Sequence, residues 1–170
     1  MRFGIAIFPQ KEVQDIANSF RKRYDPHYSL ITPHITLKES FELEEKQVEP
    51  IVKQLEEIAN TTPRFTIHFH KISTFYPTNN VIYLAIKNTE ELNTLHKKLH
   101  QGFLKQEQKY SFVPHLTIGQ DLSNDELHDV YSRLRMHKID LNSIVDRFHL
   151  LYQLENKTWK NYHTFLFGKK

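Results

Sequence analysis

Apolar residues recur along the chain with two spacings that alternate with each other. Phe3–Phe8 is a short apolar run that ends at Pro9, which predicts a buried strand. Apolar residues at i, i+3, i+4 and i+7 follow over 13–20 and predict a helix that ends at Asp25-Pro26. The same two patterns continue to the C-terminus. They predict further strands over 33–38, 65–70, 81–86, 114–118, 146–154 and 162–167, and further helices over 47–59, 89–99 and 123–134.

Several ends of these helices are marked by particular residues. Pro50 is tolerated only in the first turn of a helix, so the second helix is expected to begin near 47–49. Thr89 is a plausible N-cap of the third helix. Ser123 and Glu126 have the spacing of a capping box at the start of the fourth.

The predicted order strand–helix–strand–helix–strand occurs twice, followed by one extra strand. A Pro/Asn turn cluster at 76–80 separates the two copies. Equivalent positions are 81 residues apart at His34 and His115, and 79 apart at Val48 and Leu127. We therefore expect an α+β fold in one domain over 1–170. It would consist of two duplicated lobes, each an antiparallel sheet backed by helices, related by a pseudo-two-fold axis with a cleft between the sheets.

Composition narrows the class of protein. The chain has 170 residues, 39% of them hydrophobic and 25% charged, which is typical of a folded protein. It has no Cys, which excludes disulfides, thiolate metal sites and a Cys nucleophile. A net charge of +3 favours anionic ligands only weakly. No phosphate-binding glycine loop is present, so no cofactor is predicted. No leader or membrane-spanning segment is recognised, and we expect a cytoplasmic protein.

One tetrapeptide pattern occurs twice, at equivalent points of the repeat. Pro33-His34-Ile35-Thr36 and Pro114-His115-Leu116-Thr117 share the form P-H-φ-T, where φ is apolar. Chance placement predicts roughly 0.03 such matches in this composition. Because residues i and i+2 of a strand point to the same side, each His shares a face with its Thr. The two faces are expected to look into the same cleft.

Two imidazoles and two hydroxyls suit displacement at phosphorus. One neutral His can remove a proton from the attacking hydroxyl or water, while the other, protonated, donates to the leaving oxygen. Thr36 and Thr117 can donate to the non-bridging phosphate oxygens. Lys38 falls on the face of His34 and Thr36, as either a solvated edge charge or a substrate contact. The matching position in the second copy is Gly119, which is expected to leave room.

These residues resemble a known family. Two H-φ-T-φ motifs 81 residues apart in duplicated lobes are similar to those of the two-histidine (2H) phosphoesterase superfamily, which includes RNA 2′,3′-cyclic phosphodiesterases, also called 2′-5′ RNA ligases. The resemblance covers essentially the whole chain. The ending 145–155 and the length resemble the small YjcG-like branch. The resemblance implies metal-independent cleavage or ligation of phosphodiester bonds, with roles for His34, Thr36, His115 and Thr117 only.

Other polar residues carry weaker hypotheses. Arg147 and His149 alternate with apolar residues and can either line the cleft or face solvent. His68 and His70 have the spacing of metal ligands but no third ligand nearby, which favours a polar face at the cleft rim. His96 and His100 are interpreted as a solvated helix edge. Three tyrosines near turns can stack a base or simply pack: Tyr24, Tyr28 and Tyr76. The basic run 21–23 is interpreted as helix-end cations.

The predicted function is a phosphoesterase that acts without a metal on a 2′,3′-cyclic phosphate or related phosphodiester of RNA or a nucleotide. His34 and His115 are the expected acid and base, in an order that the sequence leaves open. Two alternatives use the same site: 2′-5′ RNA ligation, and binding of an RNA end or cyclic nucleotide without turnover. A small substrate such as a cyclic phosphate of ADP-ribose also remains open. No membrane or obligatory protein partner is expected.

Overall fold

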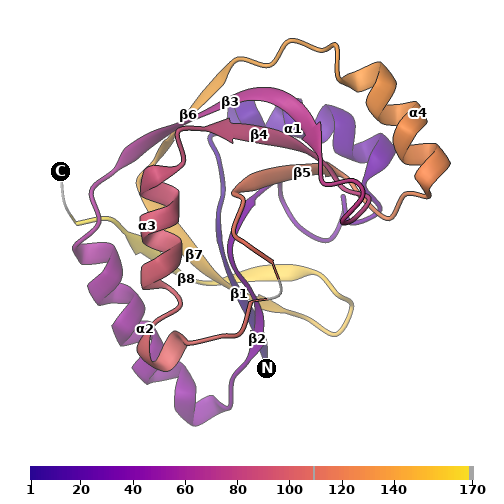
Figure 1. Cartoon of the computed structure of the whole chain (residues 1–170). Coiled ribbons are helices and arrows are strands. Elements are labelled where there is room, and N and C mark those ends of the chain that lie inside the picture. Colours follow the sequence, from indigo (N-terminus) through magenta and orange to yellow (C-terminus); the bar gives the residue numbers. More distant parts are fainter. Residues whose placement is uncertain (109, 169–170) are drawn as a thin grey trace.

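The computed structural model describes residues 1–108 and 110–168, and within them the chain forms an α+β fold (Figure 1). Eight strands make one antiparallel sheet in the order β6-β3-β4-β5-β2-β1-β7-β8. The strands are β1 Arg2–Ile7, β2 Ile35–Glu42, β3 Phe65–Thr74, β4 Ile82–Lys87, β5 His115–Gly119, β6 Leu141–Val145, β7 Arg147–Gln153 and β8 Trp159–Leu166. The α-helices are α1 Lys11–Tyr24, α2 Glu45–Asn60, α3 Glu90–Lys98 and α4 Asn124–Leu134, with one 3₁₀ turn at Gly102–Leu104.

Most predicted elements are present, and the differences have local causes. The strand β6 is missing from the prediction, because its burial alternates around the polar Ser143, which breaks the apolar pattern. Helix α2 begins at Glu45, earlier than predicted, so Pro50 lies beyond the first turn. The Gln47 side chain accepts a hydrogen bond from the Glu44 N–H at 2.8 Å and thereby fixes the earlier start.

The other two helix starts follow the sequence signals. Thr89 is the N-cap of α3, although its side chain makes no capping hydrogen bond. The capping box at α4 is confirmed, because the Ser123 Oγ accepts from the Glu126 N–H at 3.1 Å and the Glu126 carboxylate accepts from the Ser123 N–H at 2.9 Å.

The two sequence repeats exchange strands. The first two strands of each repeat are neighbours, β1 with β2 and β4 with β5. The third strand crosses over: β3 pairs with β4 and β6, whereas β7 pairs with β1 and β8. One half of the sheet, called here the β2 half, therefore contains β1, β2, β7 and β8, and the β5 half contains β3, β4, β5 and β6. The turn at 76–80 joins β3 to β4 within the β5 half.

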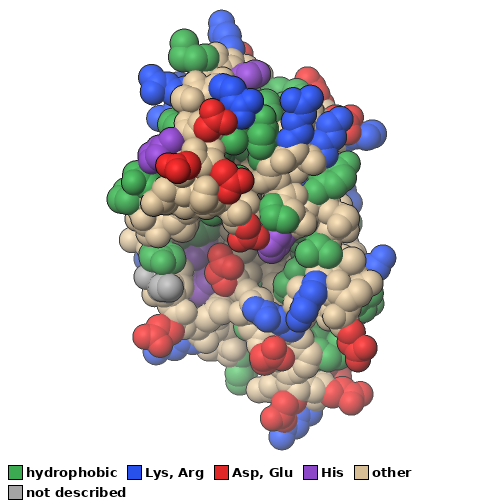
Figure 2. Space-filling view, turned by 90° about the vertical axis from the view of Figure 1, so that its right-hand side faces the viewer, with side chains coloured by type: hydrophobic (Ala, Val, Ile, Leu, Met, Phe, Trp, Pro, Cys, Tyr) green, Lys and Arg blue, Asp and Glu red, His purple; other side chains and the backbone are tan. Residues whose placement is uncertain are grey.

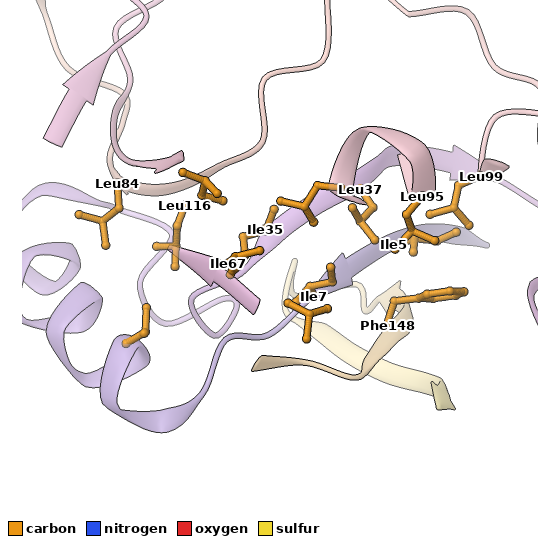
Figure 3. Close-up of a cluster of buried hydrophobic side chains, with 14 of the residues drawn as sticks. Ile5, Ile7, Ile35, Leu37, Ile67, Leu84, Leu95, Leu99, Leu116 and Phe148 are labelled. Atoms are coloured by element: carbon orange, nitrogen blue, oxygen red, sulfur yellow. The ribbon is translucent and has the colours of Figure 1, made fainter. Parts of the chain in front are cut away.

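The helices pack on the outer side of the curved sheet and hide its apolar side chains. Helices α2 and α3 contact strands of the β2 half, and α1 and α4 contact strands of the β5 half. The core runs through both halves, from Leu84 and Leu116 past Ile35 to Phe148 (Figure 3). Each such buried side chain contributes about 1.5–3 kcal/mol, so the face of every strand is fixed. Among the described helices, none is long and apolar enough to cross a membrane.

Candidate active site

The inner side of the sheet lines a cavity of about 850 Å³. Its walls come from β1, β2 and β5, from the segment 25–34, from the turn after β3, and from α3 with part of the segment that follows it. Figure 2 shows this face as hollowed, with histidine side chains inside and acidic side chains near the edge. A cavity of this volume is in the range that takes a nucleotide-sized ligand.

The two P-H-φ-T motifs meet where the halves of the sheet join. In the described part of the chain, β2 and β5 are registered at a single antiparallel pair, Ile35 with Leu116. That register sets His34 across from Thr117 and Thr36 across from His115. All four side chains line the cavity, while Ile35 and Leu116 are fully buried on the other side. The strand alternation that the sequence indicates therefore produces a convergent group of two imidazoles and two hydroxyls.

Both imidazoles are held in the same way. His34 Nδ1 lies 2.9 Å from the carbonyl oxygen of Thr32, and His115 Nδ1 lies 2.7 Å from that of Val113. A carbonyl only accepts, so each Nδ1 carries the hydrogen and donates it. In the neutral ring, Nε2 then has the free lone pair. Each His thus presents the atom that can take or give a proton, with its tautomer fixed by a backbone group two residues earlier.

Burial shifts both imidazoles toward the neutral form. Burial lowers the pKa of His34 to about 4, with smaller lowering by the charges of Arg21 and His115. The Thr32 carbonyl and the Asp25 carboxylate oppose this lowering of the His34 pKa. Burial also lowers the pKa of His115, and the Val113 carbonyl partly offsets it. His34 is therefore neutral at pH 7 and suited to accept a proton.

A buried ion pair supports the segment that carries His34. Arg21 is 2% exposed, and its Nε lies 3.3 Å from the Asp25 carboxylate. Its Nη2 donates to the Ile31 carbonyl at 2.7 Å, which fixes the chain just before the motif. The run 21–23 lies in the last turn of α1, as predicted, but the Arg21 guanidinium is buried in an ion pair, which the sequence does not indicate.

Aromatic rings fix the second histidine. The His115 ring lies edge-on to Phe75 at a centroid distance of 4.8 Å and to Tyr83 at 5.3 Å. Phe75 lines the cavity and is the last residue before the β3–β4 turn. The sequence offers no direct signal for this contact, since Phe75 lies 40 residues before His115.

The solvated-edge interpretation of Lys38 is wrong. Lys38 is 2% exposed and lines the cavity, where its Nζ donates to the Leu104 carbonyl. A bulge interrupts the alternation that was expected to set it on the face of Thr36, because Thr36 pairs with Ala6 but Lys38 pairs with Ile5. Burial lowers the pKa of Lys38 to about 8. The segment after α3 covers it, which a strand pattern alone does not reveal. Gly119, the matching residue, leaves no open space, because a Cβ there would lie 3.2 Å from the Tyr24 Cβ.

The structure does not bring Arg147 and His149 into the cavity lining. The cavity reaches β7 at Leu151, on the same side of the strand but farther along. The Phe8 ring lies against His149 at 4.9 Å, and His149 Nδ1 lies 3.1 Å from the Thr164 hydroxyl. Arg147 pairs with the neighbouring Asp146 at 2.9 Å in an exposed position. Both side chains therefore contact residues outside the two P-H-φ-T motifs.

His96 and His100 do not form a solvated helix edge. Both line the cavity, with ring centroids 4.1 Å apart, and Phe112 stacks on His96 at 3.8 Å. The sequence did contain a signal for this position, since His96 lies in the apolar stripe of Leu92, Leu95 and Leu99. What hides the rings is the segment after α3, which folds back over the helix.

The remaining candidates lie outside the cavity lining. Tyr24 packs against the core, Tyr28 lies beside Arg21, and Tyr76 lies edge-on to His128. His68 contacts Asp140 at 2.5 Å. Across residues 1–108 and 110–168, no group of three or more His, Asp or Glu side chains has the arrangement of a metal site.

Several known proteins are similar to this chain in sequence. The sequence model of the 2′-5′ RNA ligase superfamily matches residues 8–157. A protein of Geobacillus sp. strain WCH70, provisionally named as a phosphoesterase, is 54% identical over 170 residues, covering 100% of this chain and 98% of the relative. A Bacillus cytotoxicus protein with the same provisional name is 56% identical over 169 residues, covering 99% and 98%.

Solved structures share the fold at low sequence identity. A crystal structure of Escherichia coli LigT with 3′-AMP superposes with a TM-score of 0.75 at 15% identity, covering 99% of this chain and 98% of that chain. A crystal structure described as a phosphoesterase superposes with a TM-score of 0.76 at 15% identity and the same coverage.

Proposed function

The chain belongs to the 2′-5′ RNA ligase superfamily of two-histidine phosphoesterases, and from this premise we propose that it hydrolyses a 2′,3′-cyclic phosphate or related phosphodiester of RNA or a nucleotide. The observation that carries the proposal is the matched pair of imidazoles in one cavity, each with Nδ1 tied to a backbone carbonyl and Nε2 free. Mere binding of an anion does not require two such proton-transfer groups.

We assign the base to His34 and the acid to His115. His34 Nε2 takes a proton from water as the water oxygen bonds to phosphorus. The bond from phosphorus to the 2′ or 3′ oxygen breaks, and His115 Nε2 gives a proton to that oxygen. His34 suits the base role because its pKa is lowered to about 4, which keeps it neutral over most of the working pH range. The two rings return to their starting protonation through solvent.

Thr36 and Thr117 hold the phosphoryl oxygens. Each hydroxyl donates to a non-bridging oxygen, on which charge builds as the fifth bond to phosphorus forms. Their positions across from His115 and His34 set one donor beside each imidazole. Acid–base catalysis and fixed donors therefore act on the phosphate from both strands.

A nucleotide is the class of substrate that the cavity fits best. Its volume of about 850 Å³ exceeds what a phosphate alone would fill. LigT of E. coli, which shares the fold, has been crystallised with 3′-AMP and with NADP⁺. For this chain, both facts support a phosphate attached to a nucleoside.

The test is hydrolysis of the four nucleoside 2′,3′-cyclic phosphates in EDTA. We expect turnover by the wild type, and loss of about 10²–10⁴-fold in kcat for His34→Ala and for His115→Ala. His128→Ala, the same change at an exposed position on α4, should keep full activity. Full activity of either cavity variant, or a joined RNA strand as the product in place of a hydrolysed one, would contradict the proposal.

A substrate with a better leaving group distinguishes the acid from the base. A 2′-deoxynucleoside 3′-(4-nitrophenyl) phosphate expels nitrophenolate, which needs little help from an acid. On this compound, His115→Ala should recover most of the wild-type rate, whereas His34→Ala should stay inactive because the base is still missing. The opposite pattern would exchange the assignments.

A further inference from the structure

Lys38 is a buried cation without an anionic partner. It lies four residues after His34, in β2, and lines the same cavity as His34 and Thr36, beyond a bulge that interrupts the alternation of the strand. In the described part of the chain, no carboxylate forms an ion pair with it. Its Nζ, which has three hydrogens, donates to the Leu104 carbonyl and lies 5.4 Å from the centroid of the Phe41 ring.

Two imidazoles adjoin this cation. His96 and His100 of α3 line the same cavity, and the charge of Lys38 is near enough to help lower the pKa of each ring, below the larger effect of burial. His100 Nδ1 is engaged by the His96 carbonyl at 2.7 Å, which leaves Nε2 as its free nitrogen. Glu39 and Glu107 also line the cavity, where partial burial of the Glu39 carboxylate raises its pKa.

The opposite half of the sheet has no counterpart. Gly119 occupies the position that matches Lys38, and Tyr24 fills the space beside it. On that side Arg21 and His27 also line the cavity, but each is paired with a carboxylate, that of Asp25 and that of Asp121, whereas Lys38 has no such pair among the described residues. A ligand that uses both the catalytic imidazoles and Lys38 therefore has a fixed direction across the sheet junction.

We propose that Lys38, His96 and His100 form a second phosphate subsite in this cavity, which binds a phosphate on the 5′ side of the nucleoside whose 2′,3′ end reacts. The inference rests on the proposed function for the identity of the first phosphate. A second phosphate compensates the buried ammonium, which otherwise bears an uncompensated desolvation cost. Its charge also favours the protonated form of both imidazoles, so that each can donate to it.

Two kinds of ligand can supply the 5′ phosphate. It can be the terminal phosphate of a single nucleotide, or the phosphodiester that joins the reacting nucleoside to an RNA chain. Both present non-bridging oxygens to Lys38.

The test is a binding measurement that does not depend on turnover. The ligands are adenosine 3′-phosphate, adenosine 3′,5′-bisphosphate and the dinucleotide ApAp, titrated calorimetrically into the full chain. We expect the wild type to bind at least one of the two-phosphate ligands about tenfold or more tightly than adenosine 3′-phosphate, as for a charge-assisted hydrogen bond. Preference for the bisphosphate identifies a nucleotide substrate, and preference for ApAp identifies an RNA end.

Substitutions at Lys38, His96 and His100 test whether the preference for two-phosphate ligands comes from this subsite. Lys38→Met keeps an unbranched apolar side chain, one atom shorter, but removes the charge, and it should reduce the ratio of affinities to below about twofold. Lys87→Met, the same change at an exposed strand position, should keep the wild-type ratio. If Lys38→Met does not fold, the double variant His96→Gln/His100→Gln gives the same comparison and should reduce the ratio at least threefold.

The outcomes separate the two proposals. Equal wild-type affinity for all three ligands, or an unchanged ratio in a folded subsite variant, overturns the second subsite. Neither result affects hydrolysis of a nucleoside cyclic phosphate, which carries one phosphate. Conversely, an affinity ratio that depends on Lys38 supports the subsite even if the four cyclic phosphates are not hydrolysed, in which case only the proposed function fails.

Discussion

At the scale of single residues, the two threonines separate catalysis from folding. Valine has the shape and strand preference of threonine but lacks the hydroxyl. Thr36→Val and Thr117→Val should therefore fold normally and each lower kcat about 10²-fold, because one donor to the charged oxygens is lost. Steady-state kinetics with saturating cyclic phosphate measures this loss. Thr→Ser at either position should keep most of the rate, and an undiminished rate in the valine variants would remove the hydroxyls from the mechanism.

The site residues that could be predicted from the sequence depend on local contacts, whereas those that could not be predicted depend on residues far away in the chain. His34 and Thr36 share a face because of a two-residue period, which is local and legible in the sequence. Lys38 lies beyond a bulge that interrupts this period, and it contacts the Leu104 carbonyl, 66 residues away. The stacking of Phe112 on His96 is likewise set by the fold of the segment after α3. The burial of these side chains depends on tertiary packing, which the spacing of residues within one strand or helix does not predict.

At the scale of elements, the end of α1 and the segment after it act as one unit. Arg21 joins Asp25 and the Ile31 carbonyl inside the protein. Arg21→Met removes one partner of a buried pair and should lower the free energy of unfolding by about 3 kcal/mol. Urea denaturation measures the change. Lys22→Met, an exposed neighbour on the same helix, should change stability by less than about 0.5 kcal/mol, and an equal effect of both variants would contradict the buried-pair argument.

The positions of the helices and strands could be predicted from the sequence wherever one face of the element is apolar. Helix α4 begins where its capping box indicates, because Ser123 and Glu126 satisfy each other's backbone groups within one turn. Strand β6 escaped prediction, because its buried positions include Ser143, which accepts a hydrogen bond from the Gln10 N–H at 2.8 Å. Because the hydrogen-bond partner of Ser143 is 133 residues away, the sequence alone does not distinguish this buried serine from one that faces solvent.

At the scale of the whole molecule, strand exchange explains how a duplicated sequence builds one cavity. The β2 and β5 halves are registered through one residue pair, which alone would be a weak junction. However, β3 and β7 each lie in the half opposite to the other strands of their repeat, so the chain crosses the junction repeatedly. The sequence repeat predicted the symmetry of the two motifs. It did not predict the exchange, because a strand's partner is not encoded in its own period.

The histidines also make the stability of the whole fold depend on pH. Six of them have a pKa lowered in the folded state, chiefly by burial: His34, His70, His96, His100, His115 and His149. Between the unfolded pKa near 6.5 and the folded value of about 4 for His34 and His96, the unfolded chain binds more protons. The free energy of unfolding should therefore change little between about pH 7 and 8 and fall as the pH drops from 6.5 toward 4, while above pH 8 the lowered pKa of Lys38 makes it rise with pH. Glu39, whose pKa is raised by burial, acts in the opposite direction.

Urea denaturation at pH 7.5, 6, 5 and 4.5 measures this slope, and His34→Asn provides the matched variant. It removes one titrating group with a strongly lowered pKa, so its stability should decline less steeply between pH 6.5 and 4 than that of the wild type, whatever its stability at pH 7.5. His128→Asn changes an exposed ring and should follow the wild-type slope. Parallel declines for all three proteins would mean that His34 takes up its proton as readily in the folded cavity as in the unfolded chain. Its neutral form would then no longer explain why it acts as the base.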